Sequence, residues 1–341
     1  MNPVNIDRER IAQTTASGLL SQIQFREPNY TPALLEQIDE LCIEYGHLLQ
    51  LRFWGHMKSV FDAGILRHIP SVQNLAVDCM DDIQNEGQFA KLEHLRRLSF
   101  QVQNFDHPEF LSTLNTDNLE VLQLMDTRKS NLDLSALARA HRLRKLTLGC
   151  HRKGIERLTG ALLLEQLILW GQPKAQSLAF IADLESLRYL RIVRGGRETL
   201  DDLKHDTLQC LIVTWVNGLR DLGPIRRFKK LEGLGVHDQI RLSSIDLTGT
   251  SIKLIGLDNC KGLRELVGIE DLGELEQFTA VRTGLPLDQL RNRTWPKSLR
   301  VLRLWSSSKK WNEATRANLA RLGYKELGER WFPSDLDEIY G

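Results

Sequence analysis

The sequence predicts an α/β solenoid, in which one short unit of strand and turn is repeated along the chain. Three observations indicate this fold class. The spacing Leu-x-x-Leu-x-Leu, with other apolar residues at some positions, recurs twelve times in the 341 residues. Successive occurrences begin 21–24 residues apart. Within each occurrence the apolar residues alternate with period 2, which is typical of a strand with one buried face. A steady period of this length predicts units that stack on their neighbours and share a continuous core.

A short strand opens each predicted repeat, and its first apolar residue defines position 1. In residues 119–124, for example, positions 1, 4 and 6 are Leu119, Leu122 and Leu124, and Gln123 separates the last two. Strands one period apart are then parallel neighbours, with residues of the same position side by side. The twelve position-1 residues are Leu48, Val72, Leu95, Leu119, Leu143, Leu164, Leu187, Leu208, Leu231, Ile252, Leu275 and Leu299.

The second half of each repeat carries apolar anchors at looser spacing. A 3₁₀ turn or a short helix suits them, because a repeat of 21–24 residues leaves room for little more. The clearest anchors are the pairs Leu134 and Leu137, Leu178 and Ile181, Leu200 and Leu203, Leu242 and Ile245, and Leu263 and Leu266.

One repeat matches a known pattern at every position. Residues 252–260, Ile-Lys-Leu-Ile-Gly-Leu-Asp-Asn-Cys, are followed by Leu263 and Leu266 and fit LxxLxLxx(N/C)xxL. On this basis the chain resembles the leucine-rich-repeat family, over about three-quarters of its length. The resemblance implies a right-handed horseshoe solenoid with a parallel sheet on its concave face and short 3₁₀ or helical segments on its convex face. It also implies a role in binding other proteins.

The remaining repeats depart from the family at position 9, where the family has Asn or Cys bonded to neighbouring backbone in the turn. Only Cys260 conforms. We therefore expect irregular turns between the strands. The position-9 residues are His56, Met80, Gln103, Thr127, His151, Gln172, Gly195, Val216, Gln239, Cys260, Thr283 and Ser307.

We expect an N-terminal cap over residues 1–47, because a solenoid must cover the exposed ends of its core. Thr31 and Pro32 form a helix start, with Thr as N-cap and Pro at the first helical position. A helix over about 32–45 follows and ends at Gly46. Before it, residues 20–25 have the apolar spacing of an extra strand.

The solenoid is expected to span 48–310, with about twelve repeats, and a C-terminal helical cap to span 311–341. The cap helix is predicted to follow Asn312 and to run to about Leu322, before Gly323. We expect the tail that carries Trp331, Phe332 and Pro333 to act as a lid on the last repeat.

Composition narrows the classes of partner and compartment. The formal net charge of +1 gives no reason to expect nucleic acid or an anionic membrane as partner. No apolar run approaches the roughly 18 residues that span a bilayer, and the first residues lack the apolar core of a signal peptide. These two observations predict a cytoplasmic protein. The odd number of cysteines and the lack of any Cys-x-x-Cys predict reduced thiols. They are Cys42, Cys79, Cys150, Cys210 and Cys260.

Motifs for chemistry are missing from the sequence. It has no glycine-rich phosphate loop, no Gly-x-Ser-x-Gly nucleophile elbow and no paired-histidine metal spacing. We therefore predict a non-enzymatic protein without a cofactor or a metal.

The concave face carries the sharpest prediction, because positions 3, 5 and 7 of each strand should point away from the core. Trp54, Trp170 and Trp305 all occupy position 7, and tryptophan is enriched at binding hot spots. Repeats six to eight are densest in large side chains, and we expect them to form one apolar patch with a single arginine. The predicted partner-binding residues are Trp170, Tyr189, Arg191, Ile212 and Trp215, with Ile168, Val193 and His237 around them.

Repeats nine and ten predict a depression beside this patch. Gly233, Gly235 and Gly256 have no side chains to fill the face, and His237 and Asp258 would form its edge. A side chain of a ligand could enter there. Glycines inside strands also occur where packing is merely irregular.

These observations favour a non-enzymatic module that binds an unidentified protein on its concave face. One alternative is a self-associating scaffold, a homo-oligomer that buries the same patch. Another is a small-ligand or enzyme site at His237 and Asp258. By family analogy alone, a role as a bacterial effector or as a toxin-immunity protein is a third alternative.

Overall fold

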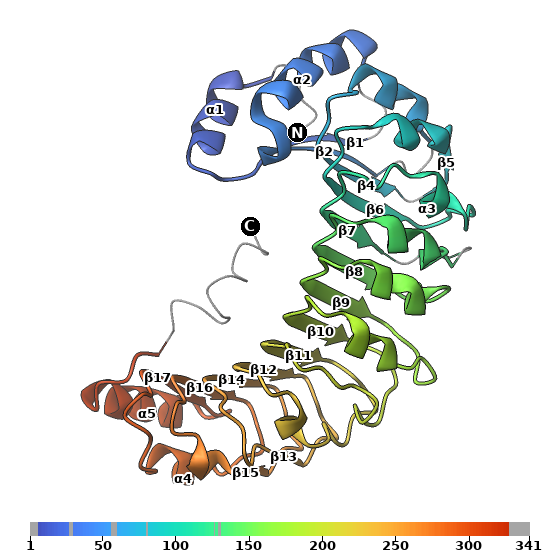
Figure 1. Ribbon diagram of the computed structural model, residues 1–341. Helices are drawn as coiled ribbons and strands as arrows, with labels where there is room; N and C mark the ends of the chain where they lie inside the picture. Colours follow the sequence, from blue (N-terminus) through green and yellow to red (C-terminus); the bar gives the residue numbers. More distant parts are fainter. Residues whose placement is uncertain are drawn as a thin grey trace. The chain divides into compact units, whose positions relative to one another are not determined.

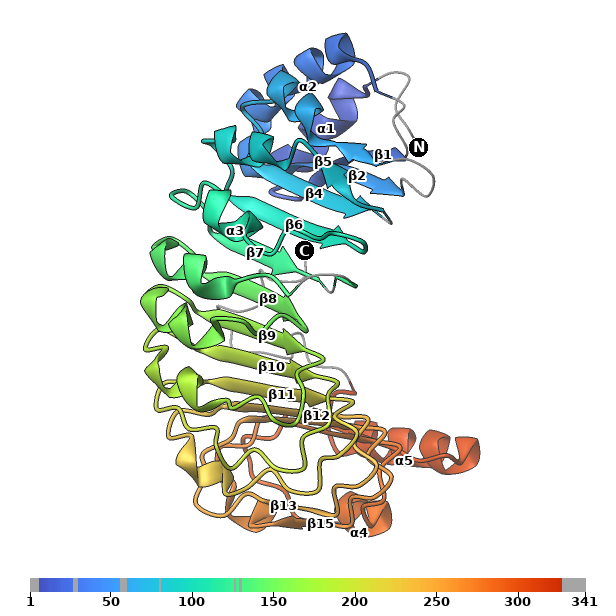
Figure 2. The ribbon, with the colours of Figure 1, turned by 90° about the vertical axis from the view of Figure 1, so that its right-hand side faces the viewer.

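The computed structural model describes residues 6–26, 30–55, 60–79, 81–125, 127–128 and 131–326 (Figure 1). These residues form two compact units, the first ending at Glu165 and the second beginning at Gln166. Each unit is built on a parallel sheet whose strands follow one another in chain order. Between these strands the chain returns through 3₁₀ turns, short helices or short outer strands (Figure 2).

The first unit has six strands in its sheet among the described residues, and a small outer pair of strands. The sheet strands are β1 (Ser21–Arg26), β2 (Leu49–Gly55), β4 (Asn74–Cys79), β6 (Arg97–Val102), β7 (Val121–Leu124) and β8 (Lys145–Gly149). The outer pair is β3 (Phe61–Asp62) and β5 (Ile83–Gln84). The helices are α1 (Arg8–Ala16), α2 (Pro32–Tyr45) and α3 (Phe110–Thr113). The 3₁₀ turns are η1 (Gly46–Leu48), η2 (Ala63–His68), η3 (Glu86–Lys91), η4 (Leu134–Arg139) and η5 (Ile155–Gly160).

The second unit has seven strands in its sheet among the described residues. They are β9 (Gln166–Trp170), β10 (Tyr189–Val193), β11 (Cys210–Thr214), β12 (Gly233–His237), β14 (Leu254–Asp258), β16 (Gln277–Val281) and β17 (Val301–Trp305). The outer strands are β13 (Ser244–Asp246) and β15 (Glu265–Val267), and the helices are α4 (Leu287–Arg291) and α5 (Lys309–Arg321). The 3₁₀ turns are η6 (Ala179–Asp183), η7 (Ile225–Arg227) and η8 (Ile269–Asp271).

The strand register confirms the predicted repeats. Each of the twelve position-1 residues stands within two residues of the start of a sheet strand. Tyr189 lies opposite Gln166 on one side and Cys210 on the other, and all three occupy position 3. The protein is therefore an α/β solenoid, in which residues of equal repeat position form rows across the strands.

The residues at positions 1, 4 and 6 form the sheet side of the core, and the apolar anchors of the outer segments form its other side. In the sixth repeat, positions 1, 4 and 6 are Leu164, Leu167 and Leu169, and all three are buried. Burying one such side chain stabilises the fold by about 1.5–3 kcal/mol relative to leaving it exposed. Repetition of this set, unit after unit, replaces the single compact core of a globular domain.

In the turns, different side chains at position 9 form hydrogen bonds to the neighbouring backbone. Buried Cys260 donates its Sγ–H to the carbonyl of Val236 at 3.3 Å, as the family pattern implies for position 9. In the fifth repeat the ring of His151 takes this place. Its Nδ1 accepts from the Leu132 N–H at 3.2 Å, and its Nε2 lies 2.9 Å from the Met125 carbonyl oxygen. Two other position-9 residues, His56 and Met80, lie outside the described residues.

The outer segments were predicted to be 3₁₀ turns or short helices, and this was only partly right. Leu134 and Leu137 lie in η4 and are buried, as expected. Ile245 and Leu266 instead lie in the outer strands β13 and β15, which pair in parallel. Each of these strands buries only its middle residue, so one apolar anchor between two exposed residues suits a strand, and strand pairing satisfies the backbone.

The N-terminal segment begins with a helix, α1, that was not predicted. After it, β1 pairs in parallel with β2, so the first sheet has a strand ahead of the twelve repeats. Helix α2 follows the predicted bounds. The Thr31 side chain accepts a hydrogen bond from the Leu34 N–H, and Gly46 ends the helix with a φ of 55°.

At the other end, α5 begins at Lys309, whereas the helix was predicted to begin after Asn312. Ser308 is its N-cap and accepts a hydrogen bond from the Trp311 N–H at 3.3 Å. Asn312 is buried inside the helix, and its amide binds the backbone of Ser306. Trp331, Phe332 and Pro333 lie outside the described residues, and the division into two caps and a solenoid remains a proposal.

Candidate functional site

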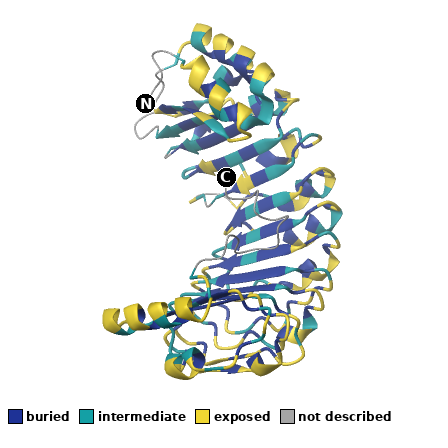
Figure 3. Cartoon of the chain, turned by 90° about the vertical axis from the view of Figure 1, so that its left-hand side faces the viewer, coloured by how far each residue is buried: buried dark blue, intermediate teal, exposed yellow. Residues whose placement is uncertain are grey.

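The open face of the second unit is the side of its sheet that carries positions 3, 5 and 7, opposite the core leucines. Figure 3 shows the strands of this unit mainly as buried and intermediate residues. The expectation of one solvent-exposed apolar patch is corrected here for three residues. The exposed fraction is 0% for Tyr189 and 3% for both Ile212 and Val193.

Lateral packing between strands explains this burial. Tyr189, Cys210 and Ile212 form a small packed cluster, and the partly buried Ile168 lies against it. Neighbouring strands are only about 4.8 Å apart, so large side chains at equal positions cover one another. These residues therefore form a second, smaller core on the open face.

Trp170 is the last residue of β9 and Trp215 follows the last residue of β11, and an arginine lies over both rings. The guanidinium carbon of Arg194 is 4.6 Å from the ring centroid of Trp215 and 5.6 Å from that of Trp170. Trp215 has 50% of its surface exposed, and Arg194 is exposed as well. We call these three residues the Trp–Arg–Trp group. Arg194 was not among the predicted residues.

An unusual backbone conformation positions this group. The residue after each of five strands has a φ between 53° and 59°, in the left-handed region. Its N–H donates to a carbonyl of the next strand, as Trp215 does to His237 at 3.0 Å, which adds one bond to the ladder. This bond offsets the roughly 1–2 kcal/mol that a non-glycine residue loses in the left-handed region. The five residues are Arg194, Trp215, Asp238, Asn259 and Arg282.

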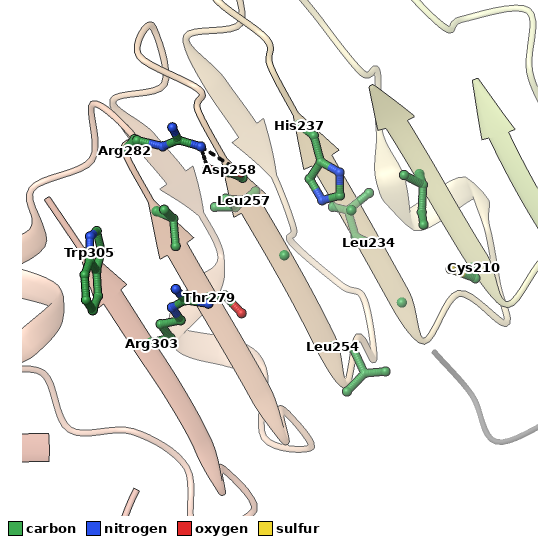
Figure 4. A pocket seen from close by; sticks show the side chains of 15 residues that line it. Cys210, Leu234, His237, Leu254, Leu257, Asp258, Thr279, Arg282, Arg303 and Trp305 are labelled. Carbon is green, nitrogen blue, oxygen red and sulfur yellow. Dashed lines mark hydrogen bonds and ion pairs between the residues drawn. The ribbon is translucent and has the colours of Figure 1, made fainter. Parts of the chain in front are cut away.

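The predicted depression at the glycines is a cavity of about 620 Å³ (Figure 4). It extends over the open face from β11 to β17. Gly233, Gly235 and Gly256 line it, as predicted, together with His237 and Asp258. Strand β16, the residue after it and strand β17 add lining residues that were not predicted for this depression, which are Thr279, Val281, Arg282, Arg303 and Trp305.

The two predicted edge residues do not act as a pair. The Asp258 carboxylate accepts from Arg282 Nη2 at 3.0 and 3.2 Å. No hydrogen bond joins His237 to Asp258 in the described part of the chain, although the two are register neighbours. Burial lowers the pKa of His237 below its ordinary value; Arg191 acts in the same direction, and Asp258 and Asp238 oppose it. A neutral imidazole therefore stands at this edge at neutral pH.

At its other end the cavity contains two polar groups with unused hydrogen-bonding capacity. Thr279 is only 3% exposed, and among the described residues its hydroxyl has no hydrogen-bond partner. Arg303 lies beside it on the neighbouring strand (Figure 4). Its guanidinium carbon lies 5.4 Å from the ring centroid of Trp305, and its Nε is likewise unpaired within the described residues.

Other chemistry finds little support in the described residues. They contain no group of three or more His, Cys, Asp or Glu side chains that could hold a metal ion. Burial raises the pKa of the Cys210 thiol at the cavity, so this thiol stays protonated and is a poor nucleophile. No helix in the described ranges is long and apolar enough to cross a bilayer.

The repeated strand-and-turn unit defines the class: the protein has the fold of the leucine-rich-repeat proteins. This confirms the resemblance at the level of the fold. An internalin of Listeria monocytogenes is similar in structure, with a TM-score of 0.51 and 16% sequence identity. The match covers 88% of this chain and 90% of the internalin chain.

Two more distant similarities have lower TM-scores. A leucine-rich-repeat protein of Leptospira interrogans has a TM-score of 0.41 and 15% identity, over 94% of this chain and 92% of its own. A chain in the Toll–Spatzle complex of Drosophila has a TM-score of 0.46 and 13% identity, over 83% of this chain. This chain spans only 42% of that one. No protein-family profile matches the sequence, and no curated protein matches it either.

Proposed function

We propose that the protein is a non-enzymatic module that binds a partner protein on the open face of its second unit. The observation that carries the proposal is the exposed Trp–Arg–Trp group. Folding does not require a half-exposed tryptophan stacked on an exposed arginine, and both residue types are enriched at binding hot spots. The glycine-lined cavity lies on the same sheet and offers a recess for a protruding side chain.

In this proposal the predicted binding residues divide into two groups. Trp170, Trp215, Arg191 and His237 would contact the partner, since each has at least intermediate exposure. The buried Tyr189, Ile212 and Val193 would support them from below, and the partly buried Ile168 would lie at the boundary between the two groups.

The charge of the face favours a protein over a nucleic acid as partner. Four arginines, Arg191, Arg194, Arg282 and Arg303, stand on it or at its edge, and Asp238 and Asp258 oppose them. Nucleic-acid binders carry a denser basic stripe than this. A surplus of two positive charges fits a mildly acidic protein surface.

A cytoplasmic, non-enzymatic role belongs to the same proposal. The free thiols of Cys42, Cys79, Cys210 and Cys260 are buried without disulfides, which suits a reducing compartment. At the cavity, Asp258 is engaged by Arg282 and Cys210 is held protonated, so neither is prepared for catalysis.

An affinity pull-down from host lysate, read by mass spectrometry, tests the proposal. We would compare wild type with Trp170→Ser/Trp215→Ser and with Trp54→Ser as the matched control. Trp54 also occupies position 7 and lies under an arginine, but it belongs to the first unit. We expect a protein that wild type and Trp54→Ser recover and that the double variant loses. Equal recovery by all three would place the site elsewhere.

Self-association on the same face is the second candidate, since a second copy would also cover exposed tryptophans. Light scattering at two protein concentrations distinguishes it. A mass that rises with concentration in wild type, and not in Trp170→Ser/Trp215→Ser, would favour the homo-oligomer.

A further inference from the structure

The cavity on the open face has two chemically different ends. At β11 and β12 it is apolar, because Gly233 and Gly235 leave the space that side chains would fill and Ile212 forms the wall. Any Cβ at Gly235 would lie 3.1 Å from Ile212 Cγ1, so the recess depends on the absence of a side chain there. An aliphatic or aromatic side chain is the group that such a recess accepts.

The opposite end, at β16 and β17, offers hydrogen-bond donors. Only 3% of the surface of Thr279 is exposed, and within the described residues its hydroxyl has no hydrogen-bond partner. An unsatisfied buried hydroxyl is costly to a fold, and so it calls for an explanation. Arg303 adds a guanidinium beside it, and the described residues contain no ion pair that engages this arginine.

Charge determines which acceptor group these two donors would bind. The nearby carboxylate of Asp258 is already bound to Arg282 at 3.0 Å. A hydroxyl beside a guanidinium is a donor pair for a carboxylate, and bonds of this kind are charge-assisted. The apolar recess and the donor pair lie in one cavity of about 620 Å³, large enough for one side chain together with a neighbouring carboxylate.

We propose that this cavity receives an acidic-hydrophobic element of the partner protein, in which an apolar side chain enters the glycine recess and an adjacent Asp or Glu carboxylate binds Thr279 and Arg303. This inference rests on the proposed function, because it identifies the chemistry of the partner at the same face. The Trp–Arg–Trp group would then contact surface outside this element.

Blocked dipeptides test the proposal without knowledge of the partner. The probes are N-acetyl-Phe-Glu-amide, the neutral N-acetyl-Phe-Gln-amide and N-acetyl-Gly-Glu-amide, which has no apolar side chain. Saturation-transfer NMR detects affinities in the millimolar range that such small ligands reach. We expect the Phe-Glu probe to bind about tenfold more tightly than the Phe-Gln probe, since one charge-assisted bond is worth roughly that factor. It should also bind about tenfold more tightly than the Gly-Glu probe, which has no apolar side chain to bury in the recess.

Three variants locate the binding. Arg303→Gln and Thr279→Val should each abolish the preference for Phe-Glu over Phe-Gln. Arg52→Gln is the matched control, because Arg52 also occupies position 5 and also lies over a position-7 tryptophan, in the first unit. Thr279→Val keeps the side-chain shape and removes the unpaired hydroxyl, so its melting temperature should equal or exceed that of wild type. A loss of preference in a variant at least as stable as wild type cannot come from unfolding.

The outcomes separate this inference from the proposed function. Equal binding of the three probes to wild type, or none, would overturn the carboxylate inference. If a partner were still recovered through Trp170 and Trp215, the proposed function would stand alone. A preference that survives in Arg303→Gln and Thr279→Val would also overturn it.

Discussion

Single residues of the open face divide into those that hold the fold and those that face solvent. Tyr189 and Trp215 illustrate the difference, since one is fully buried and the other is 50% exposed. Both are large aromatic residues in adjacent repeats, and the sequence predicts both to bind the partner. Their lateral neighbours decide which of the two contributes to stability.

Alanine substitutions should reveal this division. We expect Tyr189→Ala to lower the free energy of unfolding by about 3–5 kcal/mol, because it leaves a cavity in a packed cluster. Trp215→Ala should cost only about 0.5–1 kcal/mol, mainly through the lost stacking with Arg194. Urea denaturation followed by circular dichroism measures both values. Similar losses in the two variants would contradict the assignment of the inner cluster.

The cavity glycines Gly233 and Gly235 should respond differently to substitution by alanine. A Cβ at Gly233 would lie 3.4 Å from Cys210 Sγ, an ordinary contact, whereas at Gly235 it would lie 3.1 Å from Ile212 Cγ1. Gly233→Ala should therefore stabilise by about 0.4–1 kcal/mol through the unfolded state. Gly235→Ala should destabilise by about 1 kcal/mol, since buried Ile212 must move. Thermal melts of the two variants check the order, and a stabilised Gly235→Ala would refute the packing at the recess.

At the scale of elements, the turns show how one task is shared among residue types. Only Cys260 keeps the family residue at position 9, yet His151 makes equivalent bonds to the backbone with its ring. A departure from the sequence pattern thus does not remove the hydrogen bonds of the turn. It changes which side chain makes them.

Removing the ring of His151 should therefore lower the free energy of unfolding. His151→Ala would leave the Leu132 N–H and the Met125 carbonyl without their bonds, and we expect a loss of about 2 kcal/mol in the free energy of unfolding. His151→Asn should recover part of it, because the family uses Asn at this position. Chemical denaturation compares the two variants. Equal stability of His151→Ala and wild type would show that the ring bonds contribute nothing.

At the scale of the whole molecule, two histidines with lowered pKa values predict the direction of the pH dependence. Burial lowers the pKa of both His237 and His205 below the ordinary 6.5. Above pH 6.5 both are neutral in the folded and the unfolded protein, so their full contribution is present. As the pH falls below 6.5, the unfolded chain takes up protons first, and stability decreases toward the folded pKa.

Urea unfolding at about pH 7.5 and about pH 5.5 measures this effect. We expect wild type to be less stable at the lower pH, and His237→Gln to show a smaller difference between the two conditions. An unchanged difference in His237→Gln would mean that His237 contributes nothing to the pH dependence.

The sequence alone determined the strands of the main sheet, their register and the place of the glycine recess. All three follow from periodicity, because rows of residues 21–24 apart must meet when units stack in parallel. Only the tertiary structure decided that Tyr189 and Ile212 are buried, that Arg194 lies between two tryptophans and that Thr279 and Arg303 face the same cavity. Exposure and side-chain contact depend on how far each side chain extends toward the next strand and on the backbone conformation at the strand ends. The spacing of apolar residues does not encode either one.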